Sequence, residues 1–468
     1  MSLFDSLNIA ASSLRTLESS ISIISQNVAN AQTPNYAART PVVNAIEPGG
    51  GVEIASVQRA TDQALQQQTL TQSSQAAGDS ALSNLYQQLE NVTGGSSGTP
   101  ILSGAMTQFQ SAWQAYEASP ESTAAQQNLL QSATGLTQAL SNTAAGVQQL
   151  QTAAQANVGN DVTSLNSNLA TIAKLNTEII AAQGSKTDVS GLEDQRDAAI
   201  ASVAQLVSIR TVARSDGSVA VFMPNGLSLA STTAASFSWD GTNITDAGSA
   251  TSLNSSFQGG SIGATLGFVA TDAASVASAD PSLGVLQKLS NQLNAFAQSF
   301  YDTTAAPPPA FEAAYDGATT EPGELASSFF TTSDGSAAAN AFDLVVNPSL
   351  LNGTNQIKQA AATPVVAALT KTNQSLNAGA LSVSNQTYAG IADAIMGTVS
   401  ANAAGASSAA KSSAAVSTAL SAQLSSETGV NLDQQMSQLI VLQNSYSASA
   451  RVMTAANAML TALMAIGQ

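Results

Sequence analysis

The fold of this chain is decided by residues 3–31, which read LFDSLNIAASSLRTLESSISIISQNVANA. Apolar residues recur in this stretch with alternating spacings of four and three. That spacing is the a/d pattern of a heptad repeat, which lines one face of a helix and favours packing along a second helix. The predicted seam comprises Leu3, Leu7, Ala10, Leu14, Leu17, Ile21, Ile24, Val28 and Ala31.

A second apolar seam lies near the other end of the chain. Its first five residues recur every seven positions, and three more extend the face. A single stripe of this kind is typical of an ordinary amphipathic helix on its own domain. Two matched stripes at opposite ends instead favour a terminal helix pair, with the rest of the chain inserted between them. The second seam comprises Leu432, Leu439, Tyr446, Met453 and Leu460, with Leu442, Ala456 and Leu463.

Simple energetics set the expected stability of these ends. The first seam has seven large apolar side chains. At ~1.5–3 kcal/mol for each fully buried side chain, they contribute roughly 10–21 kcal/mol. Fixing the backbone costs ~1–2 kcal/mol per residue, and hydrogen bonds return only part of it. We therefore expect the terminal helices to be loose in the free chain and to order on self-assembly.

Composition narrows the possible functions. The chain has 468 residues, 9% charged and 4% aromatic, with a net charge of −17. This length suggests about three domains, and the composition favours long, thin helical packing over a thick aromatic core. Nucleic acids and anionic membranes are not expected partners, because both attract clustered lysine and arginine.

The chain contains no cysteine and no histidine. Disulfides, thiolate metal sites, cysteine nucleophiles and histidine general bases are therefore excluded. We predict no catalytic, cofactor-binding or metal-binding residues, and an enzyme is not expected. The sequence has no apolar run of about 18 residues that would span a membrane. It also lacks the basic start of a Sec-type secretory signal peptide, so no such signal is predicted.

The predicted fold class is mainly α, with some β structure. Residues 1–60 plus 428–468 are expected to form a coiled-coil-like terminal domain with a short hairpin over 40–60. Residues 61–207 plus 272–427 are expected to form an elongated helical domain. From about 208, alternating residues and Asp-Gly or Asn-Gly turns predict a small, outer antiparallel β domain ending at 271.

Three local predictions inside the helical domain can be checked separately. Two long helices are expected over 122–158 and 161–183, and the stretch 357–427 is expected to be helical throughout. A further helix should begin at Ser190, with Ser190 as N-cap and Glu193 in the capping-box position.

The two ends of the chain also carry a resemblance. Residues 25–36, SQNVANAQTPNY, resemble the SxNIANxxTPGY signature of rod, hook and hook-associated proteins of the bacterial flagellum. Residues 429–433 and 446–452, GVNLD and YSASARV, are similar to the ending of the hook-associated protein 1 (FlgK) family. Residues 259–268 are similar to that family's GGxLGGLLxF segment. The signature turn here comprises Asn30, Thr33, Pro34, Asn35 and Tyr36.

Two positions depart from the family pattern. Asn35 stands where the signature has glycine, which a left-handed backbone would tolerate. Gln434 and Gln435 replace an acidic pair, which puts in question any contact that needs those charges.

The resemblance implies a structural subunit that joins hook to filament in the external flagellum, exported through the flagellar type III channel. The implied partners are other copies of itself, the hook protein, and the next hook-associated or filament protein. A cytoplasmic export chaperone is also implied. The assembly interface would comprise Leu3, Leu7, Leu14, Leu17, Ile21, Ile24, Val28, Leu432, Leu439, Leu442, Tyr446, Met453, Leu460 and Leu463. The chaperone would cover Leu432, Leu439, Leu442, Tyr446, Met453 and Leu460.

Three alternatives remain open at this point. The chain could be another axial protein, such as a hook, rod or flagellin-like subunit. It could be a peptidoglycan hydrolase carried on an axial scaffold, although the 208–271 segment offers no evident acid pair. It could also be a secreted adhesin, whose β domain would bind a receptor.

Overall fold

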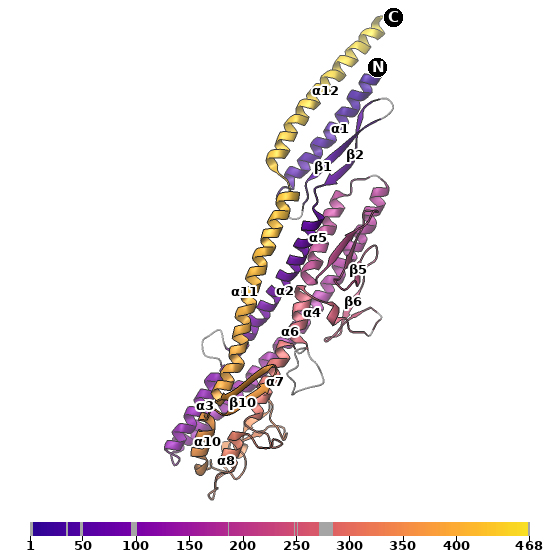
Figure 1. Ribbon diagram of the computed structural model, residues 1–468. Coiled ribbons are helices and arrows are strands. Elements are labelled where there is room, and N and C mark those ends of the chain that lie inside the picture. Colours follow the sequence, from indigo (N-terminus) through magenta and orange to yellow (C-terminus); the bar gives the residue numbers. More distant parts are fainter. Residues whose placement is uncertain are drawn as a thin grey trace.

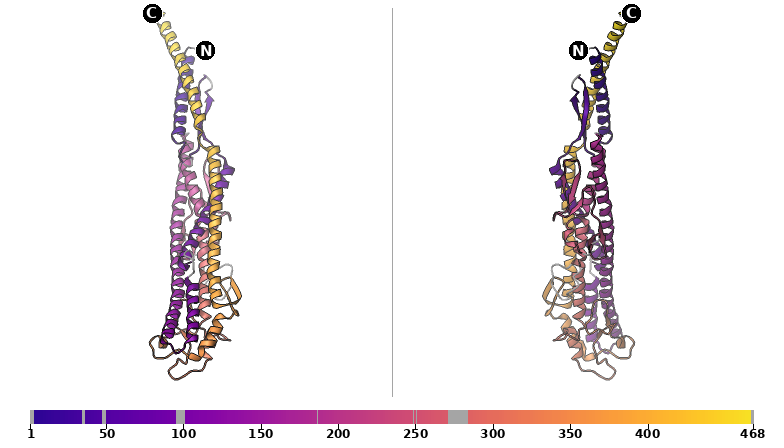
Figure 2. Two further views of the ribbon diagram at one scale, coloured as in Figure 1. Left: turned by 90° about the vertical axis from the view of Figure 1, so that its left-hand side faces the viewer. Right: turned by 90° about the vertical axis from the view of Figure 1, so that its right-hand side faces the viewer.

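The computed structural model describes residues 3–33, 36–46, 50–94, 101–185, 187–247, 249, 251–270 and 284–466. These form a long, narrow rod with both termini at the same end (Figures 1 and 2). The fold is mainly α, with several small antiparallel sheets, as the sequence predicts.

The terminal end of the rod consists of two helices and one hairpin. Helix α1 (Leu3–Ala29) lies beside α12 (Leu432–Ile466). Strands β1 (Arg39–Ala45) and β2 (Val52–Arg59) pair antiparallel and pack on α1. The predicted hairpin over 40–60 is therefore confirmed. Figure 1 shows this group projecting beyond the rest of the molecule.

Four long helices form the shaft of the rod. They are α2 (Gln63–Thr93), α4 (Thr123–Gly184), α5 (Ser190–Leu206) and α11 (Tyr388–Thr428). Helix α4 has 62 residues, which corresponds to roughly 93 Å at 1.5 Å per residue. In Figure 1, α11 runs along α2, and α4 runs along α5.

The prediction of two helices over 122–158 and 161–183 was wrong, because α4 continues through Gly159. A Cβ atom at this position would lie 3.1 Å from Cδ1 of Trp239. The glycine therefore allows the indole ring to approach the helix closely, rather than ending the helix.

The β structure between α5 and α6 (Gly260–Val269) rests on α4. Strands β3 (Arg210–Ala213), β4 (Val219–Phe222) and β5 (Ser228–Ala230) form one sheet in that order. Strands β6 (Phe237–Trp239) and β7 (Ile244–Asp246) form a hairpin, and a 3-10 turn, η2 (Asn254–Ser256), follows.

Two asparagines on α4 hold these sheets. Asn176 accepts from the N–H of Val219 and donates to its carbonyl, at 3.0 and 2.8 Å. Asn166 bonds the N–H and carbonyl of Phe237 in the same way, at 2.9 and 2.7 Å. Each carboxamide thus pairs with a strand edge as a neighbouring strand would, and leaves fewer free backbone groups there.

The far end of the rod is built from shorter elements. The helices are α3 (Ile101–Ala118), α7 (Val285–Gln298), α8 (Ala310–Asp316), α9 (Pro348–Leu351), the 3-10 turn η3 (Gln359–Ala361) and α10 (Ala362–Thr370). The strand pairs are β8 (Phe330–Thr332) with β9 (Leu344–Val346), and β10 (Gln374–Ala378) with β11 (Leu381–Gln386).

The prediction that 357–427 is helical throughout was wrong, because the β10–β11 hairpin interrupts it. Gly379 turns the hairpin with a φ of 53°, and a Cβ there would lie 2.0 Å from the carbonyl oxygen of Lys288. The turn therefore needs both a left-handed backbone and an absent side chain.

The main hydrophobic core also lies at the far end. Its aromatic rings contact one another at centroid distances between 4.8 and 6.4 Å, mostly edge to face or tilted. This dense packing differs from the expectation of long, thin helical packing without an aromatic core. The rings belong to Phe109, Trp113, Tyr116, Phe296, Phe300, Phe311, Tyr315, Phe329, Phe330 and Tyr388.

Candidate functional site: the terminal helix pair

Helix α12 has one covered face and one open face. Its main neighbour is α1, so its least exposed residues mark the face that meets α1. Gln435 and Ala456 are buried on this face. Leu439, Leu442, Met453 and Leu460 are half-buried on it. Four of the predicted C-terminal interface residues are thus brought against α1.

The open face of α12 carries large apolar side chains with no cover among the described residues. Leu463 is 67% exposed and Val441 is 61% exposed. Three residues of the predicted interface are exposed, namely Leu432, Tyr446 and Leu463. The open face comprises Leu432, Met436, Ile440, Val441, Val452, Met459, Leu463 and Met464.

The predicted seam on α1 is covered to differing extents. Ala10 and Ile24 are buried. The other large members with described side chains are half-buried, and the side chain of Leu3 lies outside the described set. The half-buried residues are Leu7, Leu14, Leu17, Ile21 and Val28.

A second face of α1, absent from the sequence prediction, is more deeply buried. Thr16, Ser20, Ile23 and Asn27 follow the same four-three spacing and are all less than 9% exposed. The Thr16 hydroxyl donates to the carbonyl of Val52 in β2 at 3.0 Å. This face meets the hairpin. Sequence reasoning missed it because three of the four residues are polar.

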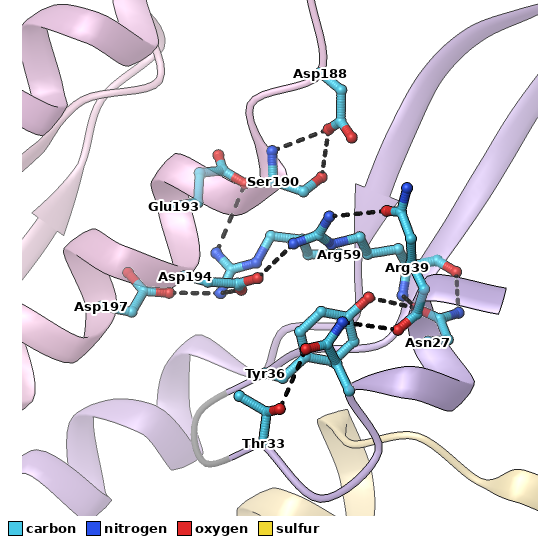
Figure 3. A network of polar contacts seen from close by, with 12 residues as sticks. Asn27, Thr33, Tyr36, Arg39, Arg59, Asp188, Ser190, Glu193, Asp194 and Asp197 are labelled. Atoms are coloured by element: carbon cyan, nitrogen blue, oxygen red, sulfur yellow. Dashed lines mark hydrogen bonds and ion pairs between the residues drawn. The ribbon is translucent and has the colours of Figure 1, made fainter. Parts of the chain in front are cut away.

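Asn27 is the polar centre of the terminal end, and Figure 3 shows it among its neighbours. Its Oδ1 accepts from the Tyr36 hydroxyl at 2.9 Å and from the N–H of Arg39 at 3.0 Å. Its Nδ2 donates to the Arg39 carbonyl at 2.8 Å and to Oε1 of Gln435 at 3.0 Å. The side chain is fully buried and its bonding capacity is filled. Asn27 therefore ties α1, α12 and β1 together.

The contact with Gln435 bears on one departure from the family pattern. Gln435 stands in place of an acidic residue, and its Oε1 accepts the hydrogen bond from Asn27. An amide oxygen accepts this bond as a carboxylate would, so the contact does not need a charge.

The signature turn lies directly after α1. Thr33 donates to Oδ1 of Asn30 at 3.2 Å, and Nδ2 of Asn30 donates to the Gln26 carbonyl at 2.9 Å. The guanidinium of Arg39 lies 4.9 Å from the ring centre of Tyr36, within range of a cation–π contact. Burial raises the pKa of the Tyr36 hydroxyl, so it remains a hydrogen-bond donor to Asn27 at neutral pH. Pro34 and Asn35 lie outside the described residues.

An ionic cluster joins the hairpin to α5. Nη2 of Arg39 lies 2.7 Å from Oδ2 of Asp194, and Nη2 of Arg59 lies 2.8 Å from Oδ1 of Asp194. The same nitrogen of Arg59 lies 2.8 Å from Asp197, and its Nη1 lies 3.6 Å from Glu193. Burial by itself would lower the pKa of Arg59, but Asp197 and Asp194 outweigh it and raise the pKa above its ordinary value. Arg59 therefore stays charged.

The local structure of α5 explains why its carboxylates are available. The prediction that Ser190 is the N-cap was wrong, because Ser190 is the first helical residue of α5. Its N–H and hydroxyl both donate to Oδ1 of Asp188, at 2.9 and 2.7 Å. Glu193, expected to close a capping box, instead points towards Arg59 (Figure 3). Burial raises the pKa of Glu193, against the opposing effect of Arg59.

The described part of the chain lacks two further features. No group of three or more acidic, histidine or cysteine side chains is arranged there to hold a metal ion. None of the helices, over those same residues, combines the length and apolar character needed to cross a membrane.

Two stretches of the sequence match families of known proteins. Residues 86–306 match the flagellar hook-associated protein FlgK helical domain and are similar to it. Residues 423–466, which include α12, match the C-terminal model of the flagellar basal body rod proteins FlgE, FlgF and FlgG. The predicted resemblance to hook-associated protein 1 is thereby confirmed.

Individual relatives are similar to part of this chain. Flagellar hook-associated protein 1 of Escherichia coli K12 is 24% identical over 233 residues, 48% of this chain and 42% of the relative. The same protein of Salmonella typhimurium matches equally. The matching region thus spans less than half the length of these relatives. The flagellar hook junction protein FlgK from Burkholderia pseudomallei matches with a TM-score of 0.46 and 23% identity, over 57% of this chain and 46% of that chain.

Proposed function

We propose that this chain is a structural subunit of the bacterial flagellum that joins hook to filament by self-assembly through α1 and α12. The observation that carries the proposal is the open apolar face of α12, in a chain whose residues 86–306 are similar to the FlgK helical domain. Many exposed large apolar side chains on one helix are typical of a surface that a partner covers. Burying it between neighbouring subunits would supply the free energy of assembly.

The proposed division of labour follows the predicted domains. Residues 1–60 plus 428–468 would polymerise, residues 61–207 plus 272–427 would form the rigid body, and residues 208–271 would face outward. The proposed partners are further copies of the chain, the hook protein, and the next hook-associated or filament protein.

The proposed export chaperone would meet both faces of α12. Leu432 and Tyr446 are exposed and accessible in the free chain. Leu439, Leu442, Met453 and Leu460 are half-buried on the face that meets α1. A chaperone that covers all six residues must therefore displace α1, so chaperone binding and pairing of the terminal helices would exclude one another.

The test separates assembly from folding. Val441→Gln combined with Leu463→Gln removes apolar surface from the open face without touching the contact with α1. We expect the free chain to keep its helical content by circular dichroism. We expect cells that carry this variant to shed their filaments, and immunogold label to disappear from the boundary between hook and filament.

The matched control is Val212→Gln, which replaces an exposed valine of β3, 45% exposed, away from the terminal helices. It should leave labelling and filament attachment unchanged. Immunogold label along the whole hook or filament would instead assign another axial role. Normal labelling at the boundary in the double variant would contradict the proposed interface.

A further inference from the structure

The terminal end of the rod is attached to the rest by few connections. We call α1, the β1–β2 hairpin and α12 the terminal unit, and the other described elements the body. The chain passes between them at residues 60–62 and 429–431. At this level the N–H of Ala38 donates to the carbonyl of Thr428, which ends α11, at 2.8 Å. Figures 1 and 2 show the terminal unit extending from the body along the rod axis.

The ionic cluster sits at this joint. Arg39 and Arg59 lie opposite each other across the hairpin, one on each strand. Both guanidinium groups reach the same carboxylate, Asp194 of α5, at 2.7 and 2.8 Å. Asp197, one helical turn below Glu193 on α5, takes a second contact from Arg59. Asp194 is therefore the residue on which both strands of the hairpin converge (Figure 3).

The ion pairs at the joint are partly buried. The side chains of Arg39 and Arg59 are 12% and 7% exposed, and that of Asp194 is 16% exposed. Partly buried pairs are screened less by salt than surface pairs, and removing one partner leaves a charge without compensation. The pair between Lys174 and Glu178 on α4 is different, because its side chains are 75% and 43% exposed. Such an exposed ion pair contributes little to the stability of the fold.

The joint is also linked to both polymerising helices. The backbone of Arg39 is bonded on both its N–H and its carbonyl to Asn27 of α1. Asn27 in turn donates to Gln435 of α12. A continuous series of polar contacts therefore runs from α12 through α1 and β1 to α5. A change in the position of Asp194 relative to the hairpin must shift or break one of these contacts.

We propose that Asp194 is a positioning residue that fixes the orientation of the terminal unit on the body. With the cluster intact, the two parts form one rigid rod before subunits meet, in place of the loose free-chain helices that the seam energetics alone predict. Without Asp194, the two parts are held by the two chain crossings, the pairs of Arg59 with Asp197 and Glu193, and the hydrogen bond from Ala38 to Thr428, and the terminal unit swings. The consequence for assembly rests on the proposed flagellar function, whereas the joint itself is a property of the free chain.

The test measures the orientation directly. The chain has no native cysteine, so spin labels can be placed at Ser19→Cys on α1 and Ser412→Cys on α11, both exposed positions. Distances between the labels are then measured by pulsed electron paramagnetic resonance on the full-length chain. We expect one narrow distance peak. Asp194→Asn, which keeps the side-chain shape and removes the charge, should abolish that single narrow peak.

Three further variants are compared with Asp194→Asn. Asp197→Asn removes one contact of Arg59 and should broaden the distribution less than Asp194→Asn. Glu178→Gln removes the exposed pair on α4 and should change nothing. Asp194→Glu, which restores the charge, should recover part of the narrow peak. A distribution for Asp194→Asn that matches the unsubstituted chain would overturn the proposal.

Folding and function are kept separate from this readout. If Asp194→Asn lost helical content, Arg39→Gln would be used instead. It removes the ion pair between β1 and Asp194 by changing the arginine, and it should also abolish the single narrow distance peak. Because the distances are measured on the free chain, the joint can fail this test while immunogold labelling still places the protein at the hook. A narrow peak lost in Asp194→Asn alongside absent labelling would keep the joint and remove the flagellar role.

Discussion

The two ends of the rod differ in how their apolar side chains are covered. At the far end, ten aromatic side chains pack into one closed core, eight of them from five helices and strands and two, Phe300 and Phe329, from the segments between them. At the terminal end, Phe4 and Tyr446 are exposed, and the most deeply buried side chain, that of Asn27, is polar. The far end therefore buries its own apolar side chains, whereas the terminal unit leaves apolar surface exposed.

This difference shows how a low aromatic content can still support a long molecule. The chain concentrates most of its aromatic residues where the elements are short and irregular. The long helices need fewer of them, because leucine, valine and alanine at helical spacing bury enough surface along α2, α4 and α11. The terminal helices can then remain poorly covered without unfolding the body.

The largest expected effect comes from breaking the closed core. Trp113→Ala removes a fully buried ring that contacts Phe109, Phe311 and Phe329. We expect the free energy of unfolding of the body to fall by about 3–5 kcal/mol, measured by urea denaturation. Phe4→Ala, at a ring that is 64% exposed, should leave the same transition unchanged within about 0.5 kcal/mol. Equal losses in the two variants would contradict the contrast.

A smaller, local effect is expected at the polar centre of the terminal unit. Asn27→Ala leaves the Tyr36 hydroxyl, Gln435 and both backbone groups of Arg39 without this partner. We expect the opening free energy of α1 and α12 to fall by about 1–3 kcal/mol, measured by amide hydrogen exchange, with protection in α4 unchanged. Asn30→Ala, whose amide bonds the Gln26 carbonyl at the surface, is the control and should have little effect. Uniform loss of protection along the rod would contradict a separate terminal unit.

The smallest effect is expected from pH at the far end. The Ser328 hydroxyl lies 3.1 Å from Glu312 and 3.0 Å from Asp316 and can donate to one of them at a time. Burial raises the pKa of both carboxyls, against the hydrogen bond from Ser328. The folded state thus binds protons more tightly than the unfolded chain. These groups therefore stabilise the fold less as the pH rises through their raised pKa values.

The measurement is the difference in melting temperature between the Glu312→Gln variant and the unsubstituted chain as the pH is lowered. Lowering the pH from about 7 to about 5 should narrow the gap in melting temperature between Glu312→Gln and the unsubstituted chain. Asp334 is the control of opposite sign, because hydrogen bonds from Ser336 lower the pKa of its carboxyl. Its contribution is present above its ordinary pKa and is lost as the pH falls through the lowered value. A constant gap for Glu312→Gln at all pH values would contradict the assignment.

Local periodicity made part of the fold readable from the sequence. The four-three spacing on α1 and α12, the hairpin over 40–60 and the change to short strands after 208 all follow from patterns within a few residues. The same logic divided α4 into helices over 122–158 and 161–183, because the ring of Trp239 that approaches Gly159 comes from a distant strand. It also missed the β10–β11 hairpin, whose turn at Gly379 is fixed by contact with the backbone of Lys288.

The sequence alone determined the heptad seams, the mainly α class, and the absence of cysteine and histidine chemistry, because these depend on residue type and spacing. The tertiary structure alone decided which face of α12 is open, that Asn27 joins three elements, and that Asp194 receives both Arg39 and Arg59. Those facts depend on where residues separated by more than 100 positions meet. Such meetings are set by packing of whole elements, which no local pattern records.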